Sequence, residues 1–273
     1  MELKTMSFLH AGSIGDVWAS LPGLKEFYKK TGYKALLYLI NGQKAIYYEG
    51  ATHPTKNEDG DMVMLNESVI KMMMPLLREQ EYIADVKIWN NQPIDVDLNR
   101  IREQFVGMPN FCISRWYFYV YPDLACDLSK QWMYVPETDK DFAKNKIIIS
   151  RTERYNNETI NYSFLKKYED EIIFTGTMRE YNNFCINFDL NVKKLSINNF
   201  LELAQAISQS KFHISNQTMA FQISQGILHP RILELCRYAP NVLVRGENAF
   251  DFFSQAALEY YVDFLYKQQN PVL

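Results

Sequence analysis

The apolar residues in the first half of the chain form short continuous runs, separated by segments in which apolar residues recur at helical spacing. The continuous runs have the length of buried strands and lie at 6–9, 35–40, 84–89 and 94–98. The helical spacing covers 17–28 and 67–80, and Pro75 is expected to kink or interrupt the second helix. Strands that alternate with helices predict a parallel sheet with helices on its faces.

The same pattern restarts after a polar, charged segment at 136–146, which has the composition of a linker. Beyond it, strands are predicted at 146–150, 171–174, 212–215, 231–235 and 242–244, and helices at 160–168, 199–210, 218–224 and 249–267. We therefore expect two α/β domains with parallel sheets, one at residues 1–140 and the other at 141–248. The remaining segment, 249–273, is expected to form a helix that packs back on the first domain.

Composition and charge narrow the class of protein. A chain of 273 residues with 47% apolar and 14% aromatic residues can form one large or two medium domains, and it is not a disordered chain. The formal net charge of −3 counts against nonspecific binding of nucleic acid. The four cysteines lie far apart, and the start of the chain has no signal-peptide pattern. No apolar run approaches the roughly 20 residues of a membrane helix, so we expect a cytoplasmic protein with reduced thiols.

The loop between the first predicted strand and the first predicted helix contains Gly12, Gly15 and Asp16. Glycines let the backbone approach a ligand closely, and the first amides of a helix attract an anion. Asp16 would then lie beside a bound substrate. Asp is also a favoured helix N-cap, so the spacing alone leaves a purely structural role equally open.

Three loops of the second predicted domain also follow strands. In the first, Arg151 and Arg154 are suited to hold phosphate oxygens, unless the loop is simply a solvated polar turn. In the second, Gly176 and Thr177 are suited to contact the base or ribose of a nucleotide. In the third, the segment 216–218 starts a helix and is suited to phosphate, although its asparagine would serve equally well as an N-cap. Because the carboxyl ends of parallel strands share one edge, we expect the three loops to meet there.

The two ends of the chain carry a pair of motifs. Near the start, Gly15-Asp16 is followed after five residues by Pro22 and then by Leu24-Lys25. Near the end, Asn216-Gln217-Thr218-Met219-Ala220-Phe221-Gln222 is followed by Pro230 and a predicted strand. With these motifs the chain resembles the heptosyltransferase type of GT-B glycosyltransferase, that is, the ADP-heptose:lipopolysaccharide heptosyltransferases and their relatives. The resemblance implies a GT-B fold, in which two Rossmann-like parallel-sheet domains face each other across a cleft.

The resemblance also implies a reaction. The protein would transfer a sugar from a nucleotide-diphosphate donor to an acceptor hydroxyl, with inversion, and Asp16 would be the general base. Donor and phosphate binding would involve Gly15, Arg151, Arg154, Gly176, Thr177, Asn216, Gln217, Thr218 and Gln222. The Asp-x-Asp pairs at 59/61, 95/97 and 139/141 all precede the predicted nucleotide-binding domain, and we interpret them as solvated carboxylates. We therefore expect no metal, and no cofactor apart from the nucleotide sugar as co-substrate.

The chain departs from the family pattern at Gln217, Met219 and Gln222, where the family usually has Asp, Gly and His. These departures leave the nucleotide and the sugar of the donor open, so ADP-heptose is not assumed. They also leave open a protein of the same fold that binds a nucleotide or sugar without catalysis. The expected acceptor is a glycan or glycolipid. A modified base in DNA, the acceptor of phage-type DNA (hydroxymethyl-base) glycosyltransferases, is the alternative.

Overall fold

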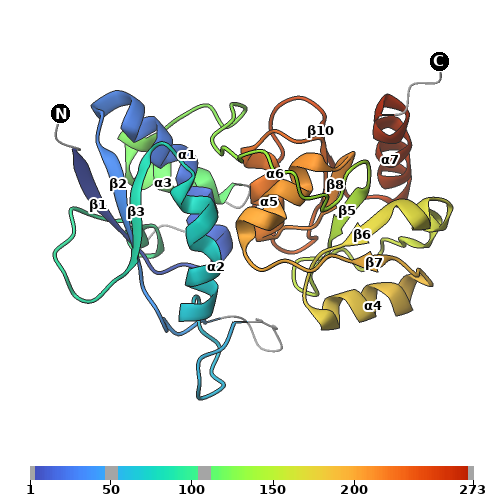
Figure 1. Cartoon of the computed structure of the whole chain (residues 1–273), viewed down its shortest axis with the longest axis horizontal. Helices are drawn as coiled ribbons and strands as arrows, with labels where there is room; N and C mark the ends of the chain where they lie inside the picture. Colours follow the sequence, from blue (N-terminus) through green and yellow to red (C-terminus); the bar gives the residue numbers. More distant parts are fainter. Residues whose placement is uncertain (1–3, 47–54, 104–111, 270–273) are drawn as a thin grey trace. The chain divides into compact units, whose positions relative to one another are not determined.

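The computed structural model describes residues 4–46, 55–103 and 112–269, and the chain folds into two compact units. The N-terminal unit comprises Met1–Leu128, Trp132–Val135 and Asn199–Leu201. The C-terminal unit comprises Ser129–Gln131, Pro136–Asn198 and Glu202–Leu273. Within the described residues, each unit contains one parallel sheet, so the expected α/β class with two parallel sheets is confirmed (Figure 1).

The sheet of the N-terminal unit has the strand order β3-β2-β1-β4. Its strands are β1 (Thr5–His10), β2 (Lys34–Leu39), β3 (Ile83–Ile88) and β4 (Val96–Asp97). Its helices are α1 (Ile14–Thr31), α2 (Glu67–Arg78) and α3 (Ile113–Val120), with short 3₁₀ helices η1 (Leu98–Arg102) and η2 (Pro122–Leu124). The four strands and two helices predicted for this half are present. Helix α2 continues through Pro75, so of the two effects expected of this proline, the interruption does not occur.

The end of β1 and the start of α1 are fixed in the core of the N-terminal unit. Phe8 and Leu9 of β1 are buried, and every residue of α1 from Asp16 to Leu24 is buried. Gly23 allows η2 to pack closely on α1, because a Cβ at this position would lie 3.0 Å from Leu124 Cβ. The loop between β1 and α1 is therefore held between two elements that the core keeps in place.

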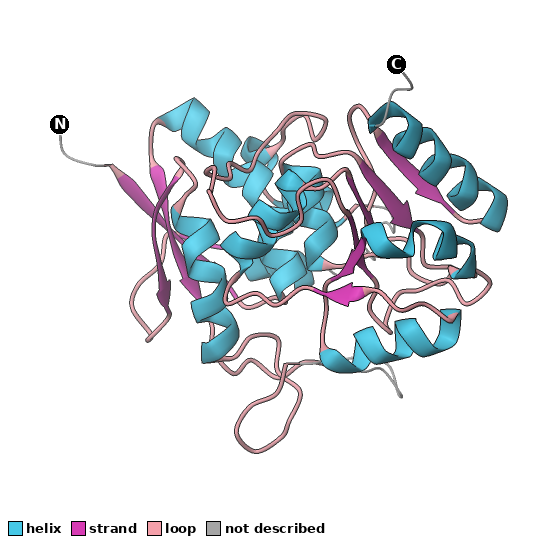
Figure 2. Ribbon diagram, turned by 45° about the vertical axis from the view of Figure 1, so that its right-hand side comes forward, coloured by secondary structure: helices cyan, strands magenta, loops and turns pink. Residues whose placement is uncertain are grey.

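The sheet of the C-terminal unit has the strand order β10-β9-β8-β5-β6-β7, and all of its neighbouring strands are parallel. Figure 2 shows the strands of the chain as magenta arrows and the helices in cyan. Its strands are β5 (Ile147–Ser150), β6 (Ile172–Phe174), β7 (Lys193–Lys194), β8 (Phe212–Ser215), β9 (Arg231–Glu234) and β10 (Ala249–Phe252). Its helices are η3 (Ser163–Glu171), α4 (Met178–Phe188), α5 (Phe200–Gln209), α6 (Met219–Gly226) and α7 (Gln255–Gln269).

The last helix lies on the C-terminal unit, in contrast to the expectation that it returns to the first domain. Its buried residues Leu258, Val262 and Leu265 belong to the same hydrophobic core as strands β5, β6, β8 and β9. Strand β10 explains this position, because it adds a parallel strand beside β9 immediately before the helix. A helix that follows an edge strand after so short a turn packs on the sheet that the strand has joined.

Several other elements differ from the sequence-based predictions. The segment 242–244 is not a strand, and residues 249–252, expected to be helical, form β10. The helix predicted at 160–168 is the 3₁₀ helix η3, and α4 and β7 were not predicted. Among the described residues, no helix is both long enough and apolar enough to cross a bilayer.

Candidate functional site

Asp16 is the third residue of α1, directly after the glycine loop. Ser13 is the N-cap residue, so the reading of Asp16 as the N-cap is wrong. The carboxylate nevertheless takes part in the helix start, because Asp16 Oδ2 accepts a hydrogen bond of 3.0 Å from the Ser13 backbone N–H. An acid in the first turn is favourable beside the positive end of the helix dipole. Gly15 precedes Asp16 in α1 and takes no part in these contacts.

Arg102 of η1 forms an ion pair with the same carboxylate oxygen. The distance from Arg102 Nη2 to Asp16 Oδ2 is 2.9 Å, and the guanidinium lies over the Trp116 ring, 5.3 Å from its centroid. The Asp16 side chain is 10% exposed and that of Arg102 is 49% exposed. Both contacts of the carboxylate use Oδ2, and among the described residues no hydrogen bond reaches Oδ1. One oxygen of Asp16 is therefore held, and the other can accept a proton.

A buried chain of hydrogen bonds braces the backbone of Asp16. The Gly12 N–H donates to His10 Nδ1 at 2.9 Å, which assigns the ring proton to Nε2. His10 Nε2 then donates to the Tyr117 hydroxyl at 2.7 Å, and this hydroxyl donates to the Asp16 carbonyl at 3.0 Å. Burial lowers the pKa of His10 to about 4, so the ring stays neutral near pH 7 and keeps this pattern.

The glycine loop is also held from its other side. The Ala11 N–H donates to Asn99 Oδ1 at 2.6 Å, and Asn99 is itself held by Asp97 Oδ1. Gly12 leaves no room for a side chain, because a Cβ there would lie 2.7 Å from both Asp16 Cβ and His10 Cε1. The glycine therefore lets the loop close over Asp16. Sequence reasoning missed His10, Asn99, Arg102 and Tyr117, although a histidine that ends a buried strand just before the loop is a usable signal.

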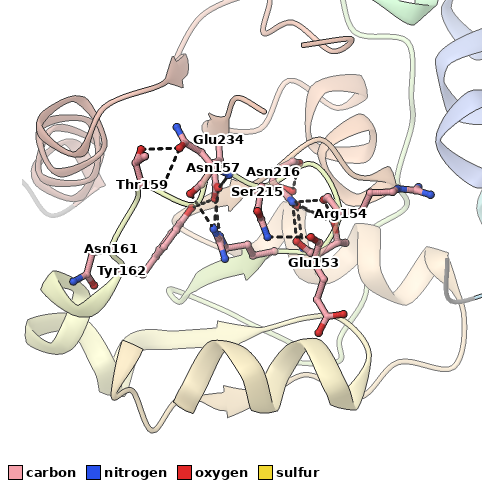
Figure 3. A network of polar contacts seen from close by, with 12 residues as sticks. Glu153, Arg154, Asn157, Thr159, Asn161, Tyr162, Ser215, Asn216 and Glu234 are labelled. Carbon is pink, nitrogen blue, oxygen red and sulfur yellow. Dashed lines mark hydrogen bonds and ion pairs between the residues drawn. The ribbon is translucent and has the colours of Figure 1, made fainter. Parts of the chain in front are cut away.

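In the C-terminal unit, the predicted loops follow adjacent parallel strands and so meet at one edge of the sheet. Ser150 at the end of β5 is opposite Ser215 at the end of β8, and Phe174 at the end of β6 is opposite Ile149. Asn216 is fully buried, and its side chain joins two of these loops (Figure 3). Its Oδ1 accepts from the Thr152 N–H at 3.0 Å, and its Nδ2 donates to the carbonyls of Thr152 and Arg154 at 3.0 and 2.9 Å.

Asn216 therefore links two loops through its hydrogen bonds, and the interpretation of Asn216 as a helix N-cap is wrong. The N-cap of α6 is Thr218, whose Oγ1 accepts from the Phe221 N–H at 3.3 Å. The remaining amides at this helix end point their hydrogens away from the helix, which favours an anion. The first turn of α6 contains no acidic residue.

Arg151 is part of a buried ion pair with Glu234, at the end of β9. Nε and Nη2 of the guanidinium contact Glu234 Oε2 and Oε1 at 2.8 and 3.0 Å. The same carboxylate accepts from the Tyr162 hydroxyl at 2.7 Å and from the Asn157 N–H (Figure 3). Burial opposes the charge of Arg151, but the Glu234 carboxylate outweighs it and raises the arginine pKa. Glu234 therefore uses Nε and Nη2 of Arg151, and the observed contacts of Arg151 stabilise the loop after β5.

Arg154 contacts an aromatic ring, and the turn after β6 leads into the start of α4. The Arg154 guanidinium lies 4.8 Å from the centroid of the Tyr155 ring, and its side chain points away from the Asn216 contacts (Figure 3). Thr177 is the N-cap of α4, with its Oγ1 accepting from the Glu180 N–H at 3.2 Å. A Cβ at Gly176 would lie 2.9 Å from the Phe174 ring, so this glycine permits the turn to pass over the strand end.

Gln217 and Gln222, two of the residues that depart from the family pattern, are both buried. Gln217 Nε2 donates to the Ala239 carbonyl at 2.7 Å and to Asn241 Oδ1 at 2.5 Å, and its Oε1 accepts from the Cys236 N–H at 2.9 Å. Gln222 is 5% exposed, and within the described residues no hydrogen bond is formed by its side chain. The buried polar atoms without a partner, among the described residues, are Trp18 Nε1 and Trp132 Nε1, so the Gln222 amide is not a buried unsatisfied group; it reaches solvent and can bind a ligand.

The acidic pairs considered as metal ligands make local contacts. Asp95 Oδ2 accepts from the backbone and the hydroxyl of Ser7, and the backbone hydrogen bond lowers the pKa of Asp95. Asp141 Oδ1 accepts from the Lys144 N–H at 3.0 Å. Over residues 4–46, 55–103 and 112–269, no three His, Cys, Asp or Glu side chains gather as a metal site.

Comparison with known proteins gives matches in structure only. No protein-family model matches the chain, and no curated sequence does. E. coli ADP-heptose lps heptosyltransferase II superposes with a TM-score of 0.61 over 97% of this chain and 99% of that chain, at 9% sequence identity. E. coli heptosyltransferase WaaC with ADP gives a TM-score of 0.59 over 96% of this chain and 99% of that chain, at 10% identity.

A third solved structure is the dodecameric iron-containing heptosyltransferase TibC in complex with ADP-D-β-D-heptose. It gives a TM-score of 0.58 over 100% of this chain and 81% of that chain, at 12% identity. At identities this low, the comparison establishes the fold and leaves the chemistry to the residues of the site. The expected resemblance is confirmed at this level: the chain has the fold of the heptosyltransferase type of glycosyltransferase.

Proposed function

We propose that the protein is a glycosyltransferase that moves a sugar from a nucleotide-diphosphate donor to an acceptor hydroxyl. One observation carries the proposal. In a fold shared with heptosyltransferases, the Asp16 carboxylate is held rigidly through Oδ2 while Oδ1 remains able to accept a proton. A fixed carboxylate with one unoccupied oxygen is what a general base for an acceptor hydroxyl requires.

In this proposal the N-terminal unit supplies the base. Asp16 takes the proton of the acceptor hydroxyl as its oxygen attacks the anomeric carbon of the donor. The bond from that carbon to the diphosphate breaks, and the nucleoside diphosphate leaves. A single displacement of this kind inverts the anomeric centre, since the attacking oxygen and the leaving group lie on opposite faces. We propose a glycan or glycolipid as the acceptor, because a net charge of −3 does not favour DNA.

The C-terminal unit supplies the donor site. The amides at the start of α6, with Thr218 as N-cap, and the Arg154 guanidinium are suited to the diphosphate. These groups stabilise the negative charge that develops on the leaving group, so we propose that the reaction does not use a metal. Gln222 is a further donor contact, because its side-chain amide forms no hydrogen bond with any described residue. Arg151 and Asn216 hold the loop from which Arg154 projects.

A screen of sugar nucleotides tests the proposal. The whole chain is incubated with ADP-, UDP-, GDP- and CDP-linked sugars, and release of nucleoside diphosphate is measured together with the thermal shift. We expect one nucleotide class to raise the melting temperature and to be hydrolysed slowly, with water as the acceptor. Binding without any hydrolysis or transfer would favour the non-catalytic binding protein. No binding in any class would contradict the proposed function.

A further inference from the structure

The loop 236–241, which follows β9, is anchored at both ends on a single residue. Gln217 accepts a hydrogen bond from the Cys236 N–H and donates to the Ala239 carbonyl and the Asn241 side chain, at distances of 2.9, 2.7 and 2.5 Å. Gln217 immediately precedes Thr218, the N-cap of α6. The loop is therefore fixed beside the end of the helix where the proposed diphosphate site lies.

Between these anchors the loop presents two exposed side chains. Tyr238 is 79% exposed, which makes it one of the most exposed large aromatic residues in the described chain. Arg237 is also exposed, and it forms no ion pair or hydrogen bond with any residue that the structure describes. A cation on a loop anchored beside the start of α6 adds to the positive potential of that helix end, and this potential attracts anions. The arrangement therefore favours a bound anion.

The order of the strands places this loop relative to the other donor contacts. Along the carboxyl edge of the sheet the strands follow in the order β6, β5, β8 and β9. The Gly176 turn follows β6 and the loop with Arg154 follows β5. The start of α6 follows β8, and Arg237 follows β9. Three strand spacings amount to about 14 Å. A nucleotide sugar whose base lies near β6 and whose diphosphate lies at α6 therefore carries its sugar toward the loop after β9.

We propose that the loop 236–241 recognises the sugar side of the donor, with Arg237 bound to the diphosphate and Tyr238 packed against the sugar ring. This inference rests on the proposed function, because it assigns the far end of the same donor site. Gln222 of α6 fits a ligand at this helix, since its side-chain amide forms no hydrogen bond within the described residues and reaches solvent. The hydrogen bonds of Gln217 make it the positioning residue for the loop.

The departure from the family pattern at position 217 now has a physical reason. Gln217 both donates and accepts, and it uses both abilities to fix the two ends of the loop. An ionised aspartate at this position has no N–H to donate to the Ala239 carbonyl. It would face that carbonyl and the Asn241 oxygen with a negative charge. The glutamine is therefore a requirement of this loop.

Calorimetry on the whole chain tests the inference, with the best-binding nucleoside diphosphate and its matching nucleotide sugar as probes. We expect Arg237→Ala to weaken both probes about tenfold. Tyr238→Ala is expected to weaken the nucleotide sugar about fivefold and to leave the nucleoside diphosphate unchanged, because the ring contacts the sugar alone. Gln217→Met, which keeps the volume and removes the hydrogen bonds, is expected to reproduce both losses.

Two control variants match these changes elsewhere in the C-terminal unit. Lys144→Ala removes an exposed cation before β5, at the opposite edge of the sheet, and Tyr260→Ala removes a 65% exposed ring from α7. Wild-type affinity in Arg237→Ala or Tyr238→Ala, as in the controls, would overturn the inference and leave the proposed function intact. An equal loss of both probes in Tyr238→Ala would also overturn it. Failure of the wild-type chain to bind any nucleoside diphosphate would instead overturn the proposed function.

Discussion

Each unit pairs an arginine with a buried acid near the edge where its strands end, but the two pairs are built differently. Arg102 meets Asp16 through one nitrogen, and its side chain is half exposed. Arg151 meets Glu234 through two nitrogens, and the Glu234 side chain has no exposed surface. The Arg102–Asp16 pair is therefore open to solvent on its arginine side, and the Arg151–Glu234 pair is closed to solvent at its carboxylate.

The difference shows which carboxylate can do chemistry. Both oxygens of Glu234 are occupied, because Arg151 donates to each of them, the Tyr162 hydroxyl also donates to Oε2 and the Asn157 N–H to Oε1. Asp16 uses one oxygen for the Ser13 amide and Arg102. An acid whose hydrogen-bonding capacity is filled serves stability, while an acid with one oxygen left can exchange a proton with a substrate. The closed pair is therefore structural, and the open pair is the candidate for catalysis.

The largest expected effect is on transfer in Asp16→Asn. The amide keeps an acceptor oxygen for the Ser13 N–H but is not basic, so we expect kcat to fall about 10³-fold. Nucleoside diphosphate affinity should be unchanged, because the proposed donor site belongs to the C-terminal unit. Steady-state kinetics and calorimetry on the same preparation check both statements. Turnover equal to wild type would remove Asp16 as the base and with it the contrast between the two pairs.

Breaking the closed pair is expected to affect stability. Arg151→Met leaves the Glu234 charge buried without its ion partner, and we expect the free energy of unfolding to fall by about 3 kcal/mol. Urea denaturation measures this change. Arg179→Met, which removes an arginine that is 70% exposed and pairs with Glu153, is the matched control and should cost less than 1 kcal/mol. Equal effects of the two substitutions would show that the Arg151–Glu234 pair is not structural.

Acid should destabilise the N-terminal unit through His10. Burial lowers the pKa of His10 to about 4 from its ordinary 6.5, so below pH 6.5 the unfolded chain binds a proton that the folded chain does not. Stability is then lost as the pH falls, by about 2 kcal/mol for this group between pH 7 and 5. Denaturation of the wild type and of His10→Gln at both pH values checks this. An identical pH dependence in the two proteins would contradict it.

The smallest effect concerns the orientation of the open pair. Arg102→Gln removes the ion that holds Asp16 Oδ2, and we expect kcat to fall about tenfold while KM for the donor stays constant. Arg102→Lys retains the charge and should recover part of the rate. Kinetics of the two variants side by side give the measurement. A change in donor KM alone would place Arg102 outside the proposed role.

Most strands of the two sheets, β7 and β10 excepted, were predictable because buried parallel strands are continuous apolar runs, as in 35–40 and 147–149. Strand β10 was missed because Ala249–Phe252 contains an aspartate and continues into an aromatic helix. Its strand conformation depends on β9, with which it pairs. The position of α7 follows from that pairing, so local pattern alone could not provide it.

The candidate site also contains residues that the local sequence could predict and residues that it could not. Asp16 and Thr218 are at helix starts that the sequence marks, and in the structure Asp16 is the third residue of α1 and Thr218 is the N-cap of α6. The partner of Arg151 could not be inferred, because Glu234 lies 83 residues further along the chain. A pair of arginines after a strand looks the same in sequence whether each one binds a ligand or a distant acid. The tertiary contacts distinguish the two arginines, because Arg151 pairs with Glu234 and Arg154 lies over the Tyr155 ring.

The contacts of Asn216 have a consequence for redesign of the donor specificity. Its strongest hydrogen bonds reach main-chain atoms, the N–H and carbonyl of Thr152 and the carbonyl of Arg154. Main-chain atoms are the same in every amino acid except proline, so these contacts of Asn216 do not depend on which side chains the loop carries. A library that varies residues 153–156 while Asn216 is retained should therefore alter the groups offered to a ligand and preserve the main-chain hydrogen bonds that Asn216 makes to the loop.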